Sequence, residues 1–326
     1  MKIAVDTLGS DLGSQPIVQA ILDFLKDNSD VEIVAFGKKE ELTLLEGKCE
    51  IVDAREVVPM EAGPFEVLHL KNSSMCQAVK AVKEKGYDAV ISAGSTGGFL
   101  SSATLTLKLL PGIKRAALVS PFPTFVKGKK MVVLDIGASN ENSAEELYQF
   151  AIMGQLYSKA VLNTKEPTTY LLSNGTEDHK GSPVIQEANK LFKERNMPGF
   201  MGNKEARNAL DGTVDVLVCD GFSGNIFLKS SEGMAKWMGS MVKKAFKKNL
   251  WSKLGYLHVK KGINEISDTL DYKSTGGAML LGVNGVVVKA HGNSDAYSFK
   301  NALKVAKAMV NAKVNDKIKE GLLANE

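Results

Sequence analysis

The chain has 326 residues, of which 44% are hydrophobic and 24% are charged, so its composition is that of an ordinary globular protein with a large core. Its 9 prolines and 30 glycines exclude collagen-like and proline-rich disordered proteins. The 41 Lys and Arg against 37 Asp and Glu leave a net charge of +4, too small to indicate a protein that binds nucleic acid.

Three cysteines without a C-x-x-C pair indicate neither a disulfide framework nor a zinc knuckle, and no metal-ligand spacing occurs. The N-terminal residues are typical of a strand and lack the charged and apolar regions of a signal peptide. No apolar run approaches the roughly 20 residues of a membrane span. We therefore expect a reduced, cytoplasmic protein.

Short apolar runs rich in β-branched residues alternate with stretches of helical spacing. The predicted strands are Ile3–Asp6, Val31–Phe36, Glu50–Asp53, Asp88–Ser92, Ala116–Ser120, Met131–Ile136, Thr169–Ser173, Val214–Asp220 and Val286–Ala290. The predicted helices include Ser73–Lys85, Phe99–Leu110, Ala144–Val161 and Val184–Glu194. The alternation predicts an α/β fold with three layers, α/β/α, around a mostly parallel sheet. We find no linker, and expect one catalytic domain over residues 1–326.

A helical arm is expected to protrude from this domain at about residues 224–271, a stretch too long for a simple crossover. Its apolar residues follow helical spacing and form one stripe: Met234, Trp237, Met238, Met241, Val242 and Ala245. Lysines lie on the opposite face. A last helical stretch, from Asp295 to about Leu323, is expected to close the domain.

Polar turns rich in Gly and Ser follow six of the predicted strands. Ligands of open α/β sheets bind at the carboxyl ends of strands, so we expect these turns to form one cleft. Backbone N–H groups of a helix that begins after such a turn favour an anion, and phosphate is the natural ligand. The residues singled out in these turns are Asp6, Gly94, Ser95, Thr96, Gly97, Asp135, Asn174, Lys180, Asp220, Ser223, Asn225, His291 and Ser294.

Several familiar motifs are missing. No G-x-G-x-x-G follows a strand, and neither G-x-x-x-x-G-K-[ST], H-E-x-x-H nor G-x-S-x-G occurs, so nucleotide, metalloprotease and serine-hydrolase sites are not indicated. Inorganic phosphate or a phosphate ester remains as the candidate ligand.

The roles of single residues are ambiguous, because His291 could cap a helix and Lys180 could be a surface lysine. Cys219 is either core or a nucleophile, and Arg115 binds an anion or closes an ion pair.

Longer segments resemble a known family. Ile91–Gly97, Val218–Asn225 and Gly276–Gly285, followed by Lys289–Gly292, are similar to the PlsX phosphate acyltransferases. Further similar segments occur in the order of that family and extend the resemblance from residue 1 to about residue 310; they are Lys71–Met75, Leu134–Ala138, Gln149–Gly154 and Phe200–Asn203.

The resemblance implies an enzyme that transfers a fatty acyl group from acyl carrier protein to inorganic phosphate. The product, acyl phosphate, would supply a glycerol-3-phosphate acyltransferase in phospholipid (phosphatidic acid) synthesis. The resemblance also implies a fold like isocitrate dehydrogenase and phosphotransacetylase, a homodimer, no metal or other cofactor, and peripheral membrane attachment. Two alternatives remain open, a short-chain acyl-CoA phosphotransacetylase-like enzyme and a catalytically inactive acyl or phosphate sensor.

Roles can be assigned to the site residues on this hypothesis. Lys180, His291, Asn225 and Asp220 form the expected catalytic set, in which Lys180 and His291 neutralise charge on phosphate and on the carbonyl oxygen. The turn from Gly94 to Gly97 is expected to cradle phosphate, with Ser223 opposite. The remaining phosphate-site residues are Asp6, Asp135, Asn174 and Ser294. No acyl-enzyme is required, so Cys219 is expected to be structural.

The arm carries eight lysines and no Asp or Glu between Lys236 and Lys261. Without them the chain has 33 basic against 37 acidic residues, a net charge of −4. The arm is therefore expected to contact an anionic membrane, the acidic carrier protein or a second subunit. The contact residues named for it are Trp237, Lys243, Lys247, Trp251, Leu254, Tyr256 and Leu257.

Overall fold

A computed structural model describes residues 1–63, 65–270 and 275–323, and its strands form one sheet in the order β3-β2-β1-β4-β11-β10-β5-β6-β9-β7-β8. The strands are β1 (Lys2–Asp6), β2 (Glu32–Gly37), β3 (Glu50–Asp53), β4 (Ala89–Ser92), β5 (Ala117–Pro123), β6 (Lys130–Leu134), β7 (Thr169–Ser173), β8 (Phe200–Glu205), β9 (Val216–Val218), β10 (Ala278–Leu281) and β11 (Val286–Lys289). The α-helices are α1 (Gln15–Leu25), α2 (Ser74–Lys85), α3 (Thr96–Leu107), α4 (Ala144–Val161), α5 (Pro183–Glu194), α6 (Gly221–Lys247), α7 (Leu250–Leu270), α8 (Ala296–Asn311) and α9 (Val314–Leu323). The predicted α/β fold with a mostly parallel sheet is confirmed.

The sheet contains two groups of parallel strands. β3, β2, β1, β4 and β11 form one group, and β6, β9, β7 and β8 form the other. Between them, the pairs β11–β10, β10–β5 and β5–β6 are antiparallel. The sense of the strands is therefore opposite in the two groups, and the polar turns that follow them fall into two sets.

Two strands escaped the sequence-based prediction. β10 reads Ala-Met-Leu-Leu and contains no β-branched residue, so its composition favours a helix. β8, at the edge of the sheet, reads Phe-Met-Gly-Asn-Lys-Glu and is mostly polar. Both strands are defined by their pairing with neighbours, which a local pattern does not contain.

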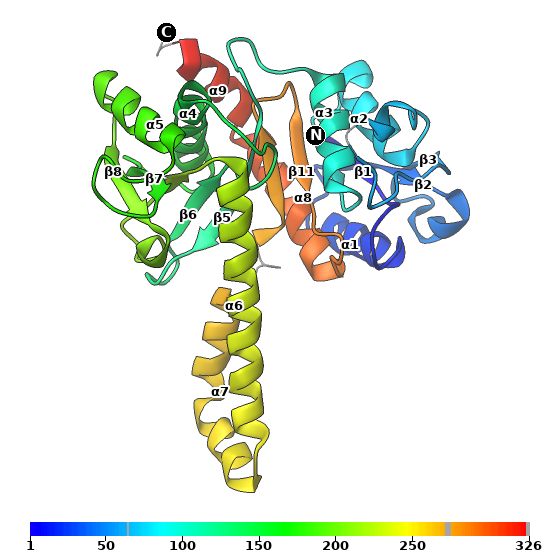
Figure 1. Ribbon diagram of the computed structural model, residues 1–326. Coiled ribbons are helices and arrows are strands. Elements are labelled where there is room, and N and C mark those ends of the chain that lie inside the picture. The colour runs from blue at the N-terminus through cyan, green and yellow to red at the C-terminus, as the bar shows by residue number, and fades with distance from the viewer. Residues whose placement is uncertain (64, 271–274, 324–326) are drawn as a thin grey trace.

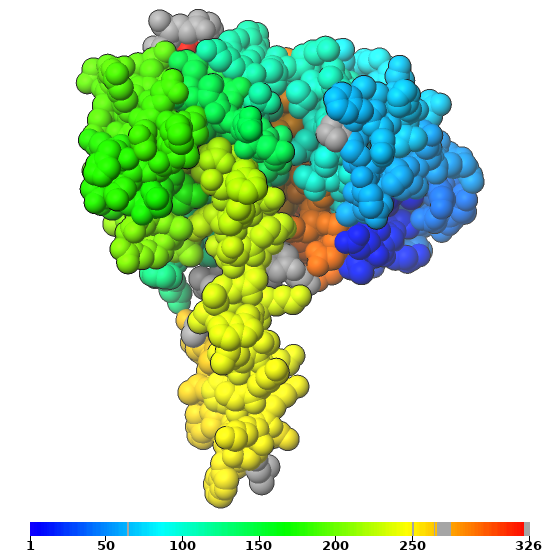
Figure 2. Space-filling model, in the orientation of Figure 1, coloured from blue at the N-terminus to red at the C-terminus, as the bar shows by residue number. Residues whose placement is uncertain are grey.

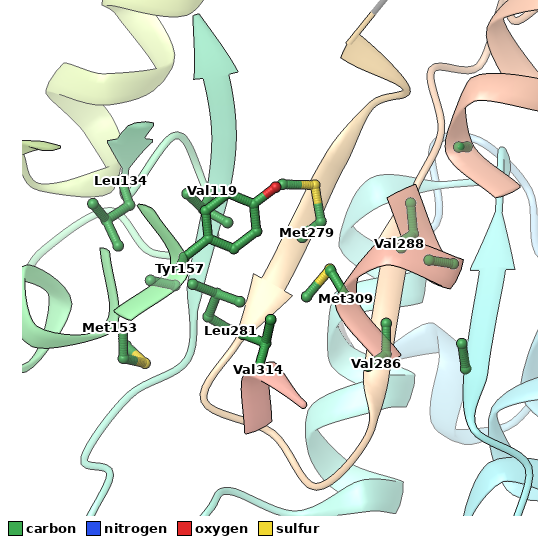
Figure 3. Close-up of a cluster of buried hydrophobic side chains, with 14 of the residues drawn as sticks. Val119, Leu134, Met153, Tyr157, Met279, Leu281, Val286, Val288, Met309 and Val314 are labelled. Carbon is green, nitrogen blue, oxygen red and sulfur yellow. The ribbon is translucent and has the colours of Figure 1, made fainter. Parts of the chain in front are cut away.

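Helices cover both faces of the sheet. One apolar core lies under α1, α4, α5, α8 and α9, and the other lies under α2, α3 and the first turns of α6. Figure 3 shows part of the first core, where Tyr157 of α4 lies among Met279 and Leu281 of β10 and Met309 of α8. The second face, between α3 and α6, is the one that carries the site described below.

The helices beside the site begin immediately after strands, each at a polar capping residue. The Ser95 side chain accepts a hydrogen bond from the Gly98 N–H at the start of α3, and the Asp220 carboxylate accepts one from the Ser223 N–H at the start of α6. Asp295 caps α8 in the same way. These caps satisfy orphan N–H groups and fix where each helix leaves the sheet.

The predicted helical arm is present, and Figure 1 shows α6 and α7 projecting side by side from the body. Only the first turns of α6 pack on the sheet, where Phe227 stacks on Phe122 with ring centroids 5.5 Å apart. Beyond them, Trp237 is 58% exposed and Trp251 is 81% exposed. The predicted end of the arm, Asp271, lies outside the described residues. Among the helices described, none has the length and apolar character needed to cross a membrane.

Candidate active site

A row of side chains crosses four neighbouring strands at the carboxyl ends of β1, β4 and β11. Asp6 pairs with Ser92, Ser92 with Lys289, and Lys289 with Ala278 of β10. Paired residues of neighbouring strands project to the same face, so these four side chains lie side by side. This polar row faces the space between α3 and α6.

Asp6 is fully buried and holds the start of the row in place. The hydroxyl groups of Ser74 and Ser92 each donate to its carboxylate at 2.6 Å, and the Leu8 N–H donates at 3.2 Å. Burial raises the pKa of Asp6 to about 6, although these hydrogen bonds oppose the rise. Asp6 is therefore an ionised group at neutral pH that supplies negative charge to the row.

Lys289 is the unusual member of the row, because its ammonium group is buried with little compensation. Burial lowers the pKa of Lys289 to about 8, while the charges of Asp11 and Asp6 oppose this change. Within the described part of the chain, its Nζ has one hydrogen bond, which it donates to the carbonyl oxygen of Ala290. A buried cation that lacks an ion-pair partner is a natural binding point for an anion.

His291 lies two residues beyond Lys289 and meets α6. Its Nε2 is 3.9 Å from Glu232 Oε1, and the other Glu232 oxygen is 3.1 Å from Lys229 Nζ. Burial lowers the pKa of His291, the charge of Glu232 opposes this change, and Lys289 and Lys229 act in the same direction as burial, so the neutral imidazole is favoured. Glu232 Oε1 is buried without a hydrogen-bond partner, which leaves it available to orient the ring.

The N-terminus of α3 lies beside the row. The Gly94 N–H donates to the Ser92 hydroxyl at 3.0 Å, which connects this turn to Asp6 through Ser92. Thr96 and Gly97 are exposed in the first turn of α3. Their backbone N–H groups and the positive end of the helix dipole favour an anion at this place.

Residues after β11 form a compact turn. The Ser10 hydroxyl and the Asp11 N–H both donate to the Gly292 carbonyl oxygen at 2.9 Å. Ser294 is buried, with its hydroxyl 3.4 Å from that of Ser298. Ser294 thus lies beneath the turn. Asp11, in the same turn, provides a negative charge that opposes the fall in the pKa of Lys289.

The second set of polar turns follows β6 and β9. Asp135 is buried and accepts hydrogen bonds from the N–H groups of Leu118, Gly137, Ala138 and Ser139 and from the Ser139 hydroxyl. Asp220 accepts from the Ser223 N–H and hydroxyl. These carboxylates bind the N–H groups of their own turns and thereby stiffen them.

Asn225 and Cys219 lie at the same end of α6. Asn225 packs against Gly137, where a Cβ on that glycine would lie 3.5 Å from the Asn225 side chain. Cys219 is fully buried, with its Sγ 3.3 Å from the Asp135 carbonyl oxygen. Burial raises the pKa of the Cys219 thiol well above its usual range. A thiolate nucleophile is therefore disfavoured here.

α6 connects the two sets of turns. It begins at Gly221, next to Ser139 and Asn142, and reaches His291 at Glu232. Seven residues separate Asn225 from Glu232, about 10 Å along a helix axis. Figure 2 shows α6 crossing the body, with a recess beside it in which the orange C-terminal segment is visible.

Lys180 and Asn174 belong to the loop after β7, five strands away from β11 in the sheet. At about 4.8 Å per strand this is about 24 Å between strand axes. Asn174 Oδ1 accepts from the Gly181 N–H at 2.8 Å, and the Lys180 N–H donates to the Glu177 carbonyl oxygen at 3.0 Å. The structure therefore places Lys180 in the second group of strands and His291 beside the first.

Sequence reasoning missed three charged residues of the site, namely Lys289, Lys229 and Glu232. Lys289 ends an apolar run as a surface lysine often does, and the other two lie on a helix assigned wholly to the arm. Arg115, left open between two roles, closes an ion pair with Glu146 at 2.8 Å. Within the described ranges, no three His, Cys, Asp or Glu side chains gather as they would around a metal ion.

Known proteins resemble this chain over nearly its whole length. The phosphate acyltransferase of Dictyoglomus turgidum is 41% identical over 330 residues, covering 99% of this chain and 98% of that protein. The one from Thermosipho africanus is 42% identical over 324 residues, again covering 99% and 98%. A phosphotransacetylase from Streptococcus pyogenes superposes with a TM-score of 0.61 at 19% identity, covering 96% and 94%, which confirms the predicted phosphotransacetylase-like fold.

The match to a family agrees with these relatives and with the resemblance predicted from the sequence. Residues 1–317 match the family described as "Fatty acid synthesis protein". The match spans the polar row, α6 and the arm. This chain therefore belongs to the fatty acid synthesis protein family.

Proposed function

We propose that this protein is an enzyme that transfers a fatty acyl group from acyl carrier protein to inorganic phosphate, giving acyl phosphate. The observation that carries this proposal is the buried ammonium of Lys289, which has no carboxylate at ion-pair distance among the described residues, beside His291 and the N-terminus of α3. Such a place attracts a small anion. The names of the relatives, phosphate acyltransferases, supply the reaction class.

The reaction requires a phosphate oxygen to attack the thioester carbonyl carbon. A C–O bond forms, the C–S bond breaks, and the proton of hydrogen phosphate ends on the leaving sulfur. Lys289 and the first turn of α3 hold phosphate and stabilise the negative charge that develops. Neutral His291, oriented by Glu232, accepts the phosphate proton and returns it to sulfur.

The remaining predicted site residues have supporting roles in this proposal. Asp6 and Ser92 position Lys289 and the α3 turn, while Asp135, Asp220 and Ser223 fix the start of α6. Asn225 lies at the start of α6, and buried Ser294 supports the turn after β11. Asn174 stabilises the loop after β7 by accepting a hydrogen bond from the Gly181 N–H. Lys180 lies in that loop, about 24 Å from β11 between strand axes, and does not contact the phosphate in this proposal.

The proposal is tested by trapping acyl phosphate with hydroxylamine. The purified protein is given phosphate and either palmitoyl-acyl carrier protein or short-chain acyl-CoA, and the hydroxamate is measured by colour. We expect phosphate-dependent hydroxamate from the carrier-protein donor. Preference for short-chain CoA donors would favour a phosphotransacetylase-like enzyme, and no product from any donor would favour a sensor. Lys130→Met, an exposed lysine, is the control for Lys289→Met.

For the arm we propose peripheral contact with an anionic membrane, in a cytoplasmic homodimer that delivers acyl phosphate to a glycerol-3-phosphate acyltransferase. Support comes from exposed Trp237, Trp251, Leu254 and Leu257 beside Lys243, Lys247 and Tyr256. Aromatic and basic residues together suit a headgroup interface. Sedimentation with anionic liposomes at low salt tests this, and we expect Trp251→Glu with Leu257→Glu to abolish it. Sedimentation unchanged by the double variant would contradict membrane contact by the arm.

A further inference from the structure

An apolar groove of about 330 Å³ lies between α3 and the central strands. This acyl groove, as it is called below, has walls from Leu100, Leu105, Phe65 and Leu68 and a floor from Leu280 and Ala116. Its volume falls within the range of small-molecule pockets, roughly 300–1,000 Å³. Phe65 is 80% exposed at its mouth, which is unusual for so large an apolar side chain.

The acyl groove and the polar row lie on the same face of the sheet. Ala278 pairs with Lys289, and Leu280 projects from the same face of β10 two residues further on. Two residues of strand span about 7 Å, so the floor of the groove begins about 7 Å from the row of Lys289.

α3 connects the same two places. Its first turn, at Thr96 and Gly97, lies at the proposed phosphate position, and its side carries Leu100 and Leu105 along the groove. One helix thus offers N–H groups at one end and an apolar wall beyond it. A ligand with an anionic or polar reacting end and an apolar tail matches this order.

We infer that the acyl groove holds the hydrocarbon tail of the acyl donor, with the thioester carbonyl at Lys289. This inference rests on the proposed function. Four residues separate the row of Lys289 from the level of Ala116, about 13 Å of strand, which accommodates a tail of many CH₂ groups. Arg115 at the far end is already paired with Glu146, so it offers no strong competing site for an anion.

The inference predicts that chain-length preference is set by the groove. Each CH₂ group that becomes buried improves kcat/KM roughly fourfold until the groove is filled. Thr104 lies on the groove wall and is half-buried, so Thr104→Trp fills the groove without opening the core. Lys83→Trp, on the exposed side of α2, is the matched control.

The first experiment compares kcat/KM for palmitoyl and butyryl donors. We expect Thr104→Trp to lower the ratio of palmitoyl to butyryl kcat/KM at least tenfold, whereas Lys83→Trp leaves the ratio unchanged. A ratio of palmitoyl to butyryl kcat/KM that is the same in Thr104→Trp and in the wild type would overturn the inference, whether or not kcat/KM falls for both donors.

A second experiment does not depend on catalysis. Palmitate is titrated against the protein with a bound anilinonaphthalene sulfonate probe, and displacement of the probe reports occupancy of the groove. We expect Thr104→Trp to weaken palmitate binding at least tenfold. Equal binding by both proteins would reject the groove as the tail site. If palmitate binds as expected but no donor yields acyl phosphate, the groove stands and the proposed function fails.

Discussion

Two buried charged residues end central strands on the same face of the sheet, and their surroundings differ sharply. Asp135, after β6, receives hydrogen bonds from four backbone N–H groups and one hydroxyl. Lys289, at the end of β11, donates one hydrogen bond, to a neighbouring carbonyl oxygen, among the contacts described. Burial raises the pKa of Asp135 against these five hydrogen bonds, and it lowers the pKa of Lys289, which has far fewer hydrogen bonds among the described contacts.

This difference distinguishes a residue with a structural role from one that suits a ligand-binding role. A buried carboxylate with full hydrogen bonding stabilises the turn that supplies its donors. A buried ammonium without a carboxylate partner lowers the free energy of unfolding. Such a group is retained where a bound ligand supplies the missing negative charge. On this comparison we propose that Asp135 belongs to the framework of the site and that Lys289 holds the ligand.

The largest effect is expected from Lys289→Met. Removing the group that holds the anion should lower kcat/KM for phosphate by about 10²–10³-fold. The folded-state pKa of about 8 lies below the ordinary 10.5, so burying the charge costs about 3 kcal/mol below pH 8. That cost disappears as pH rises from 8 to above 10.5.

Urea unfolding at pH 7 measures the second part of this prediction. Lys289→Met should be more stable than the wild type by up to about 3 kcal/mol, with the gain vanishing near pH 11. If Lys289→Met is fully active and no more stable than the wild type, the contrast between Lys289 and Asp135 is wrong.

Asp135→Asn should act in the opposite way. The amide presents an N–H₂ group to backbone donors, so buried N–H groups lose their acceptor and the free energy of unfolding falls by about 2–3 kcal/mol. The activity that remains, per folded molecule, should exceed that of Lys289→Met. Thermal unfolding together with the hydroxamate assay checks this. Unchanged stability would show that Asp135 is not part of the framework.

The pH dependence of phosphate binding gives a smaller effect. Lys289 loses its proton as pH rises through about 8, so KM for phosphate should rise several-fold between pH 7.5 and 9. Lys289→Arg keeps its charge over this range, and its KM should be flat. Parallel profiles for the two proteins would mean that another group titrates.

The smallest effect is expected from Cys219→Ser. Its thiol is buried against the carbonyl oxygens of Leu134 and Asp135, and its raised pKa keeps it protonated. Activity should stay within about threefold of the wild type, since a hydroxyl reaches the same acceptors, with a stability loss of about 1 kcal/mol. Loss of activity with an intact fold would point to an acyl-enzyme route.

Much of the fold was predictable because local patterns encode it. The alternation of strands and helices, the apolar stripe of the arm and the caps at Ser95 and Asp220 all lie within short segments. β10 was not predictable, since Ala-Met-Leu-Leu becomes a strand only between β11 and β5. The antiparallel centre, which divides the polar turns into two sets, follows from that strand.

The site was predictable in part. Asp6, His291 and the Gly94–Gly97 turn were singled out from their place after strands, and the structure places all three at the carboxyl ends of β1, β4 and β11. Lys289 was not singled out because its surroundings come from segments far apart in the sequence, including Asp6, Asp11 and Lys229. Glu232 and Lys229 were missed for the same reason. Their spacing on α6 indicates only an amphipathic helix.

The account depends most on where phosphate is held, and one measurement tests this directly. Hydroxamate formation is followed against phosphate concentration, at saturating palmitoyl-acyl carrier protein, for the wild type, Lys289→Met and Lys180→Met. We expect kcat/KM for phosphate to fall at least 100-fold in Lys289→Met and much less in Lys180→Met. Near-wild-type kcat/KM in Lys289→Met, with loss in Lys180→Met, would contradict the account and place phosphate at the end of β7.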